Sequence, residues 1–385
     1  AKILPVPLNF GTLQDVFAYL NALPEKIVVV IDEYPYLKAM NDSATVDSIF
    51  QNIIDNRLVN IELILSGSHI GMMKDALQEK NALYGRFAVT IKLNELNYLE
   101  AAKFYPDKTP YDKAAHYAVF GGSPFVNQAL QPTATIRENI ISTILNPMSA
   151  VYLYASQLLL SDYSVKINAE RIFSVIGNGK KRYTEIEDKL DVKKTGNLSK
   201  QIKSLIDLEI IARNSPINKI GDNKKSTFEI NDNLLRFYFT FIYKNASALQ
   251  VLGAEAFYDE YIAPALTDFI SRRFEGICRD YFSHQVRSGK MKGVRNIGSY
   301  YYDDPAHRKN GEFDVALEFA DGYEIYEAKY YAQPMTLDEI HREVQQVEAI
   351  KELTVKQIGF IAINGFAERE EPYLYLDGND IFANE

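Results

Sequence analysis

Residues 27–33 read Ile-Val-Val-Val-Ile-Asp-Glu, a run of mostly β-branched apolar residues that ends in two carboxylates. A continuous apolar run of this length is typical of a strand that is buried on both faces of a parallel sheet. Residues 61–65 (Ile-Glu-Leu-Ile-Leu) predict a second buried strand, and helical patterns are found at 13–20 and 46–55. This alternation of strands and helices predicts a parallel α/β sheet.

The two carboxylates, Asp32 and Glu33, have the form of a Walker B element. Because open α/β sheets bind ligands at the carboxyl ends of their strands, we expect an ATP site there. Asp32 is expected to hold Mg²⁺ through water, and Glu33 to polarise the water that attacks the γ-phosphate. Ser66, after the next strand, is placed to sense the phosphate, and Arg86 is able to stabilise transferred charge. The alternative is that the strand ends in acids for solubility alone.

The phosphate-binding loop G-x-x-x-x-G-K-[ST] that accompanies a Walker B strand occurs nowhere in the 385 residues. The sequence opens with a loop-like Pro5-Val6-Pro7 segment and has no strand candidate ahead of residue 27. We therefore expect that a segment with the P-loop is absent from this chain. Residues 1–385 by themselves are not expected to hydrolyse ATP.

The middle of the chain, residues 147–244, begins with helical periodicity and continues with short helices at 183–190 and 197–208. Two apolar runs, 210–213 and 227–230, flank a polar turn and predict a hairpin. Helix, helix, helix, hairpin is the order of a winged helix.

Lysines lie on or just before the exposed face of the predicted recognition helix at 197–208 and in the wing, where they are able to neutralise DNA phosphates. The predicted DNA-binding residues are Lys194, Lys200, Lys203 and Lys224. The alternative is a solvated helix in a domain that only mediates protein contacts.

The last part of the chain predicts the order αβββαβ. The helices are expected at 266–282 and 337–350, and the strands at 295–302, 312–319, 323–330 and 358–363.

Three residues on the second and third of these strands form a D-x₁₂-E-x-K pattern: Asp314, Glu327 and Lys329. Glu327 and Lys329 share one face of their strand, and Asp314 on the neighbouring strand is able to reach it. The two carboxylates suit Mg²⁺, and Lys329 is placed to orient or deprotonate an attacking water. Glu275 is expected to add a carboxylate, and Gln345 or Gln346 a phosphate or water contact. The alternative is a cross-strand salt bridge on an exposed face.

The composition of the chain restricts the classes of protein that these predictions allow. The net charge of -9 argues against a chain coated uniformly for nucleic acid, although it permits a local basic face. A single cysteine, Cys278, excludes an internal disulfide and a cysteine-based zinc site. No apolar run reaches the length of a membrane span and no signal-peptide pattern is present, so a cytoplasmic protein without membrane contact is expected.

Nearly the whole chain resembles one family, the archaeal-type AAA ATPases, also common in Bacteroidetes, that carry a C-terminal domain of unknown function related to PD-(D/E)XK nucleases. The segments that carry the resemblance are 30–37 (VIDEYPYL), 65–73 (LSGSHIGMM), 83–87 (LYGRF), 120–124 (FGGSP) and 205–211 (LIDLEII), together with Asp314, Glu327 and Lys329. The resemblance implies that Asp32 and Glu33 are Walker B residues and Ser66 a sensor-like position. It also implies that the trio near the C-terminus lies at the nuclease-core positions.

The expected fold is therefore a multidomain α/β chain. Its predicted parts are the C-terminal portion of a P-loop ATPase core (1–93), a helical lid (94–146), a winged helix (147–250) and a restriction-endonuclease-like domain (251–385). The leading hypothesis is a nucleotide-dependent switch in which ATP and Mg²⁺ control double-stranded DNA binding and the nuclease-like domain. One rival is a regulatory or signalling ATPase with a non-cleaving, partner-binding C-terminal domain. Another is a Mg²⁺-dependent DNA nuclease with an ATPase scaffold. A protein partner or homo-oligomer is compatible with each.

Overall fold

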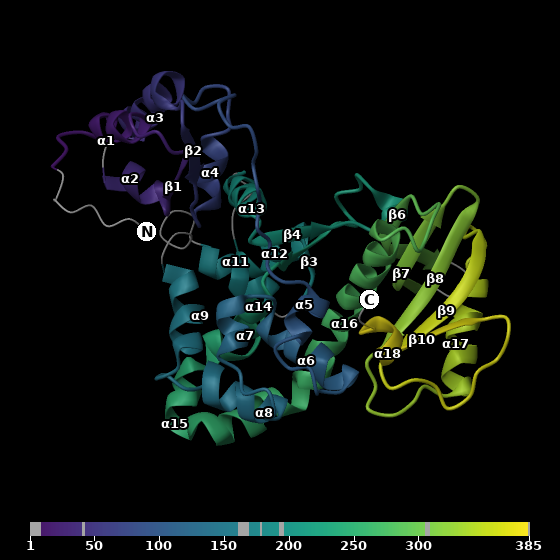
Figure 1. Cartoon of the computed structure of the whole chain (residues 1–385). Helices are drawn as coiled ribbons and strands as arrows, with labels where there is room; N and C mark the ends of the chain where they lie inside the picture. Colours follow the sequence, from purple (N-terminus) through teal and green to yellow (C-terminus); the bar gives the residue numbers. More distant parts are fainter. Residues whose placement is uncertain are drawn as a thin grey trace. The chain divides into compact units, whose positions relative to one another are not determined.

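A computed structural model of the protein describes residues 9–40, 43–160, 169–177, 179–191, 196–304 and 309–383 (Figure 1). The chain divides into two compact units, Ala1–Leu93 and Asn94–Glu385. Within the described residues, its regular structure is mixed, with helices and three separate sheets.

The first unit is built on two parallel strands, β1 (Ile27–Ile31) and β2 (Ile61–Leu65), paired from Ile27↔Ile61 to Ile31↔Leu65. Both strands fall where the apolar runs predict them. The helices of this unit are α1 (Leu13–Asn21), α2 (Tyr34–Met40), α3 (Ser43–Arg57) and α4 (Ile70–Asp75). Phe17 from α1 and Ile53 from α3 are buried against Ile61, which places these two helices on one face of the sheet.

The prediction that β1 is buried on both faces is wrong for this unit. Val28 and Val30 are 58% and 59% exposed, and Ile64 of β2 is 50% exposed. Alternate residues of a strand point to opposite faces, and the helices pack against the other set, Val29 and its neighbours. Within the described residues of this unit, nothing covers the second face.

The second unit begins with helices that share one hydrophobic core. These helices are α5 (Tyr98–Ala102), α6 (Pro110–Phe120), α7 (Pro124–Gln128), α8 (Ile136–Asn139) and α9 (Ala150–Leu160). Gly122, between α6 and α7, is a position where no side chain fits. A Cβ atom there would lie 2.0 Å from the carbonyl oxygen of Leu96, whose N–H donates to the Gly122 carbonyl at 3.0 Å. The Gly-Gly motif therefore closes the loop onto residue 96.

Three helices and a small sheet follow, with a core of their own that includes Ile172, Ile186, Leu205 and Ile230. The helices are α11 (Ala169–Ile176), α12 (Tyr183–Leu190) and α13 (Asn197–Asp207), and the strands are β3 (Lys181–Arg182), β4 (Ile211–Asn214) and β5 (Thr227–Ile230). β4 and β5 form the predicted antiparallel hairpin, and β3 adds to β5. The sequence did not predict β3, because two residues carry no periodicity.

Helical segments then lead into the last sheet. They are α14 (Asn233–Phe237), α15 (Ala246–Phe257) and the 25-residue α16 (Ala263–Arg287). In the part of the chain that the structure describes, no helix has both the length and the apolar character needed to cross a bilayer.

The last sheet has the strand order β10-β9-β8-β7-β6. Its elements are β6 (Asn296–Asp304), β7 (Lys309–Phe319), β8 (Gly322–Lys329), α17 (Leu337–Glu348), β9 (Val355–Ala362), β10 (Leu374–Asp377) and α18 (Gly378–Ile381). β6, β7 and β8 form an antiparallel meander, and β9 and β10 add in parallel. The predicted order αβββαβ is confirmed. The four-residue strand β10 and helix α18 were missed because neither is long enough to show a period.

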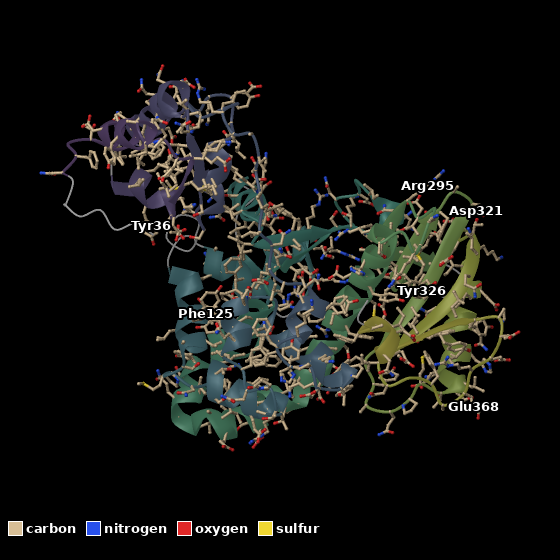
Figure 2. All side chains as sticks on the ribbon, viewed as in Figure 1. Tyr36, Phe125, Arg295, Asp321, Tyr326 and Glu368 are labelled. Carbon is tan, nitrogen blue, oxygen red and sulfur yellow. The ribbon has the colours of Figure 1, made fainter. Side chains whose placement is uncertain are left out.

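Helices cover both faces of this sheet (Figure 1). On one face, Val315, Tyr326 and Ile361 pack in the same core as α16 and α6, with Tyr326 (labelled in Figure 2) only 2% exposed. On the other face, Ile340 and Val344 of α17 pack with Phe360. The sheet therefore has the buried faces that a stable platform for a site requires.

His116 of α6 is fully buried in the helical part and uses both ring nitrogens. Nδ1 lies 2.7 Å from the carbonyl oxygen of Asp112, and Nε2 lies 3.2 Å from the amide nitrogen of Asn139. A neutral ring that carries its proton on Nδ1 donates to the carbonyl and accepts from the amide. Burial lowers the pKa of His116 to about 4.

We expect this histidine to make the second unit sensitive to acid. The unfolded chain binds a proton at a pKa of about 6.5, whereas the folded chain resists it. The folded state therefore has its full stability from the neutral His116 ring above about pH 6.5, and this contribution is lost progressively as the pH falls toward about 4. At about pH 5 the loss should be about 2 kcal/mol relative to neutral pH. Urea unfolding of the protein and of His116→Gln at both pH values tests this, because the variant should lose less stability on acidification. Equal losses would contradict it.

Candidate functional site

The site in the C-terminal sheet lies where strands β7 and β8 stop pairing and separate. β7 pairs with β8 from Phe319↔Gly322 to Val315↔Tyr326, and the pairing ends there, next to Asp314 and Glu327. β8 continues to pair with β9 through Lys329. The end of β7 therefore leaves its neighbour at the residues that the D-x₁₂-E-x-K pattern singles out.

A β-bulge in β7 accompanies this parting. Gly298 of β6 pairs with Ala316 and Tyr300 pairs with Phe313, so β7 has one extra residue between these two pairs. The extra residue falls at Asp314 or Val315. Bulges re-aim side chains and bend the strand that carries them. Val315 keeps its place in the hydrophobic core, while Asp314 turns toward β8.

The carboxylate of Asp314 takes a backbone partner on β8. Its Oδ2 accepts from the N–H of Ala328 at 3.4 Å. The backbone donor lies between Glu327 and Lys329, so this contact fixes Asp314 beside both residues. The structure thus brings together the three residues that the sequence predicts.

Lys329 connects the trio to α17. Its Nζ lies 2.6 Å from Oε1 of Glu327 and 3.1 Å from Oε1 of Glu343, and the three side chains are 15–23% exposed. Glu343 is a carboxylate that the sequence reasoning missed. The available signal was its position next to Val344 on the buried stripe of the helix. Gln346, by contrast, donates from Nε2 to the hydroxyl of Tyr302 at 2.8 Å, and no interaction joins Gln345 or Gln346 to the trio among the described residues.

Burial and neighbouring carboxylates shift the pKa values in this cluster. Burial raises the pKa of Asp314 well above its ordinary value, and the nearby carboxylates of Glu327 and Glu275 raise it further. Burial also raises the pKa of Glu327, against the opposing effect of Lys329. Burial alone would lower the pKa of Lys329, but Glu327 and Glu343 outweigh it and raise the value. A cation is the natural complement of such a group.

Glu275 of α16 lies on the other side of the same site. It forms ion pairs with Lys180 at 3.4 Å and with Arg279 at 3.9 Å. Arg279 in turn donates from Nη1 to the carbonyl oxygen of Asp314 at 2.7 Å. The expected extra carboxylate is therefore close enough to act on Asp314, and both cations pair with the same oxygen, Oε2. Among the described residues, no three His, Cys, Asp or Glu side chains are grouped to hold a metal ion by themselves.

The predicted site in the first unit also assembles at one sheet edge. Ser66 donates from Oγ to Oδ1 of Asp32 at 2.7 Å, and its N–H donates to the carbonyl of Ile31. Oε2 of Glu33 accepts from the N–H of Ser68 at 3.3 Å. Glu33 has a φ of 52°, a left-handed conformation that is unusual for a residue other than glycine. Asp32, Glu33 and Ser66 therefore meet at the carboxyl end of the parallel pair.

Arg86 is engaged elsewhere. Its Nε and Nη2 each donate to a carboxylate oxygen of Asp55 at 2.8 Å, and its Nη1 donates to the carbonyl of Ala82. No interaction joins Arg86 to the three residues at the sheet edge within the described residues. The bidentate pair instead ties the segment after α4 to α3.

A buried polar network anchors the chain just after this edge. Asp47 of α3 is 4% exposed and accepts from the Tyr34 hydroxyl at 2.6 Å, from Lys38 Nζ at 2.8 Å and from the Asn81 amide at 2.8 Å. Tyr34 follows Glu33, and its N–H donates to the carbonyl of Ser66. The network therefore fixes the turn that presents both acids, since breaking one partner of a buried charge pair costs several kcal/mol.

The lysines predicted to contact DNA differ in their surroundings. Lys200 and Lys203 are exposed on α13, opposite the buried Leu198, Ile202 and Leu205. Lys194 lies outside the described residues. Lys224 is exposed in the β4–β5 connection.

That connection packs against the edge of the C-terminal sheet. Asn218 donates from its amide to the carbonyl of Tyr301 at 2.8 Å and accepts from the same residue's N–H at 3.0 Å. Lys225 lies 3.8 Å from the centre of the Tyr301 ring. The connection thereby covers the exposed edge of β6, so it is less free to reach DNA than a solvated wing.

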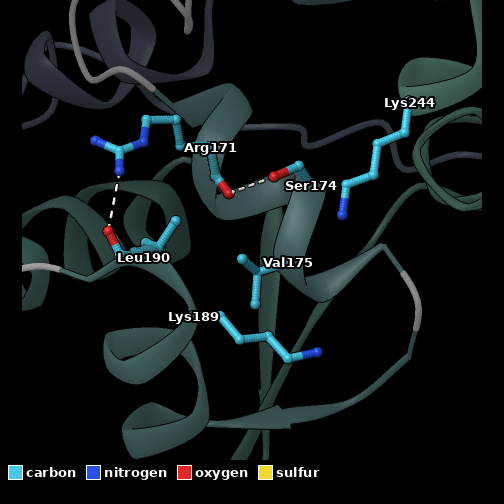
Figure 3. Close-up of a pocket in the computed structure, with 6 residues that line it drawn as sticks. All are labelled: Arg171, Ser174, Val175, Lys189, Leu190 and Lys244. Atoms are coloured by element: carbon cyan, nitrogen blue, oxygen red, sulfur yellow. Dashed lines mark hydrogen bonds between the residues drawn. The ribbon is translucent and has the colours of Figure 1, made fainter.

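A basic hollow of about 310 Å³ lies beside α11 (Figure 3). The described residues that line it are Arg171, Ser174, Val175, Lys189, Leu190 and Lys244. Three of these side chains are cationic and none is a carboxylate. Figure 3 shows Lys189 and Lys244 reaching toward the hollow from different elements, while Arg171 turns to the carbonyl of Leu190 at 3.0 Å. Sequence reasoning did not single out these residues, because they are far apart along the chain.

Comparison with known proteins finds similarities but no activity. Residues 238–345 match DUF234, archaeal and bacterial proteins of unknown function, and this segment contains Asp314, Glu327, Lys329 and Glu343. An uncharacterized protein of Methanocaldococcus jannaschii is 28% identical over 283 residues, which cover 72% of this chain. The aligned part spans 62% of that relative's length.

Two solved structures align over most of the chain at very low similarity. One is a Vibrio cholerae protein (9% identity, TM-score 0.26), with 96% of this chain and 93% of that chain covered. The other is Can2 from Sulfobacillus thermosulfidooxidans in complex with cyclic tetra-adenylate (8% identity, TM-score 0.21), with 92% and 87% covered. Neither likeness bears on fold or function at this level.

Proposed function

We propose that this protein acts on double-stranded DNA through a nuclease-type centre formed by Asp314, Glu327 and Lys329. The observation that carries the proposal is the convergence of these side chains where β7 leaves β8. The αβββαβ order, the bulge at Asp314 and the resemblance to PD-(D/E)XK nucleases support the same assignment. The winged-helix-like segment, with Lys200 and Lys203 exposed on α13, supports DNA as the substrate.

The residues present fit a magnesium ion. Mg²⁺ retains several waters and is commonly held by one or two carboxylates together with substrate phosphate oxygens. Asp314 and Glu327 supply two carboxylates, and burial raises the pKa of both. When bound, Mg²⁺ would stabilise the negative charge that develops on the phosphate.

The chain's own groups have separate tasks in this proposal. Asp314 Oδ2 accepts from the Ala328 N–H, while Oδ1 has no hydrogen-bond donor among the described residues and is available to bind. The ion pairs of Lys329 with Glu327 and Glu343 keep it as an ammonium that donates, which suits orienting a water or a phosphate oxygen. Glu343 is a positioning residue for Lys329, and Arg279 is one for the backbone of Asp314.

The second candidate function is ATP handling by the first unit, which would make the protein a nucleotide-dependent switch. The contact between Ser66 Oγ and Asp32 Oδ1 at the carboxyl edge of the parallel pair favours it. No P-loop pattern occurs in the 385 residues, so they offer Asp32, Glu33 and Ser66 for this role but no recognisable phosphate-binding loop. In this proposal Asp32 would hold Mg²⁺ through water and Glu33 would face the attacking water.

We expect Asp314→Asn and Lys329→Met each to slow Mg²⁺-dependent cleavage of supercoiled plasmid DNA by at least about a hundredfold. Each change removes a charge from the reacting centre while it keeps the side-chain volume. Glu312→Gln, on the same strand but exposed, is the matched control and should cut at the parental rate. If the parental protein binds DNA but leaves it intact with Mg²⁺ or Mn²⁺, the non-cleaving alternative holds and the nuclease proposal fails.

For the ATP proposal, the gene product at its natural length is the material to test. Asp32→Asn should weaken Mg²⁺-dependent binding of ATP, and Glu33→Gln should retain binding but lose turnover by about a hundredfold or more. Glu62→Gln, on β2, is the control. Fluorescence titration with an ATP analogue and phosphate release measure the two effects. If ATP binding and turnover are the same in both variants as in the parent, ATP handling at this edge is refuted.

A further inference from the structure

A second basic pocket, of about 290 Å³, lies beside the site formed by Asp314, Glu327 and Lys329, which we call the carboxylate–lysine centre. One wall is the turn at residues 179–181 that enters β3, and the other is the middle of α16. The residues that line it are Gly179, Lys180, Lys181, Arg272, Arg273 and Glu275. Four cations and one carboxylate therefore face a single cavity in a chain whose net charge is -9.

The positive charge of this pocket is only partly neutralised. Lys180 pairs with Glu275 at 3.4 Å. Lys181 and Arg272 have no carboxylate partner among the described residues. Unpaired cations around a cavity attract an anion, because each one adds to the local potential and neither is compensated by the protein.

Arg273 adds an unsatisfied donor. It is only 8% exposed, and its Nη1 donates to Oε2 of Glu229 at 3.0 Å. Glu229 is shared with Arg236 at 3.4 Å, so one carboxylate serves two guanidinium groups. The Nε–H of Arg273 has no acceptor among the described residues. A buried donor without an acceptor is costly. Because two guanidinium groups share one carboxylate, positive charge is in excess here, and an anionic oxygen in the pocket would reduce that excess.

Gly179 keeps the pocket open. Its φ of 108° is one that residues with side chains rarely adopt, and a Cβ atom there would lie 3.0 Å from Nη1 of Arg272. The glycine thus lets the turn approach the guanidinium of Arg272 without blocking it.

The pocket and the carboxylate–lysine centre share a wall. Glu275 lines the pocket and also raises the pKa of Asp314, while Arg279, four residues along α16, donates to the Asp314 carbonyl. We infer that the pocket binds a backbone phosphate of a nucleic acid and thereby holds the strand beside the centre. Lys181 and Arg272 are its principal contacts. This inference rests on the proposed action on DNA, and it names the contact that positions that substrate.

The test is binding, without chemistry, of a fluorescein-labelled DNA duplex to the whole chain in EDTA. Arg272→Glu and Lys181→Glu should each weaken binding about tenfold or more at moderate salt. Arg272→Ala should reduce the slope of log affinity against log salt by about one, the value for one lost phosphate contact. Lys103→Glu changes the net charge equally on an exposed helix end away from the pocket, and it should bind nearly as the parent does. Circular dichroism melting checks that each variant folds.

Competition separates the sources of phosphate. Unlabelled duplex should displace the probe, whereas inorganic phosphate and ATP at the same phosphate concentration should not. If ATP or phosphate binds with an affinity that depends on Arg272 and the duplex does not compete, the nucleic-acid assignment is overturned. Parental affinity and salt slope in both pocket variants would overturn it as well. Loss of binding in these variants, together with absence of cleavage by the parent, would leave the pocket standing and remove only the nuclease proposal.

Discussion

The C-terminal site depends on one geometric constraint: β7 must part from β8 at Asp314. If β7 remained paired with β8, their backbone N–H and carbonyl groups would bond to each other and leave no space between the two strands. The bulge inserts one residue, and the Asp314 carboxylate accepts the Ala328 N–H that a continuing partner strand would otherwise approach. The parting therefore creates the space for a site and also places an acid in it.

The surroundings hold this parted end in place. α16 packs on one face of the sheet with Val315 and Tyr326, and it sends Arg279 to the carbonyl of the same Asp314. α17 packs on the other face and supplies Glu343 to Lys329. The two helices thus provide both the apolar cover and the polar contacts of the site. A centre built on packed strands and helices is more rigid than one carried by loops, as positioning of reactive groups requires.

Sequence periodicity was sufficient for the longer elements but not for the shortest ones or for every contact. Hydrophobic patterns located β1 and β2, and the apolar stripe of α13 correctly left Lys200 and Lys203 exposed. Alternation along a strand brought Asp314 near Glu327 in principle, yet the bulge that achieves it has no sequence signal here. Exposure of Val28 and Val30 was also unforeseen, because a pattern reports what a strand is able to bury and not what covers it. Glu343, Lys180 and Arg272 belong to distant segments, so only the fold brings them to the site.

We propose that Asp314 and Glu327 together bind a divalent cation. Electron paramagnetic resonance of Mn²⁺ measures this directly, since bound and free ions differ in their spectra and no DNA or cleavage is needed. We expect saturable Mn²⁺ binding by the parent chain, which Mg²⁺ displaces and which the double change Asp314→Asn, Glu327→Gln removes. Mn²⁺ binding that persists unchanged in the double variant, or its absence from the parent, would contradict the account.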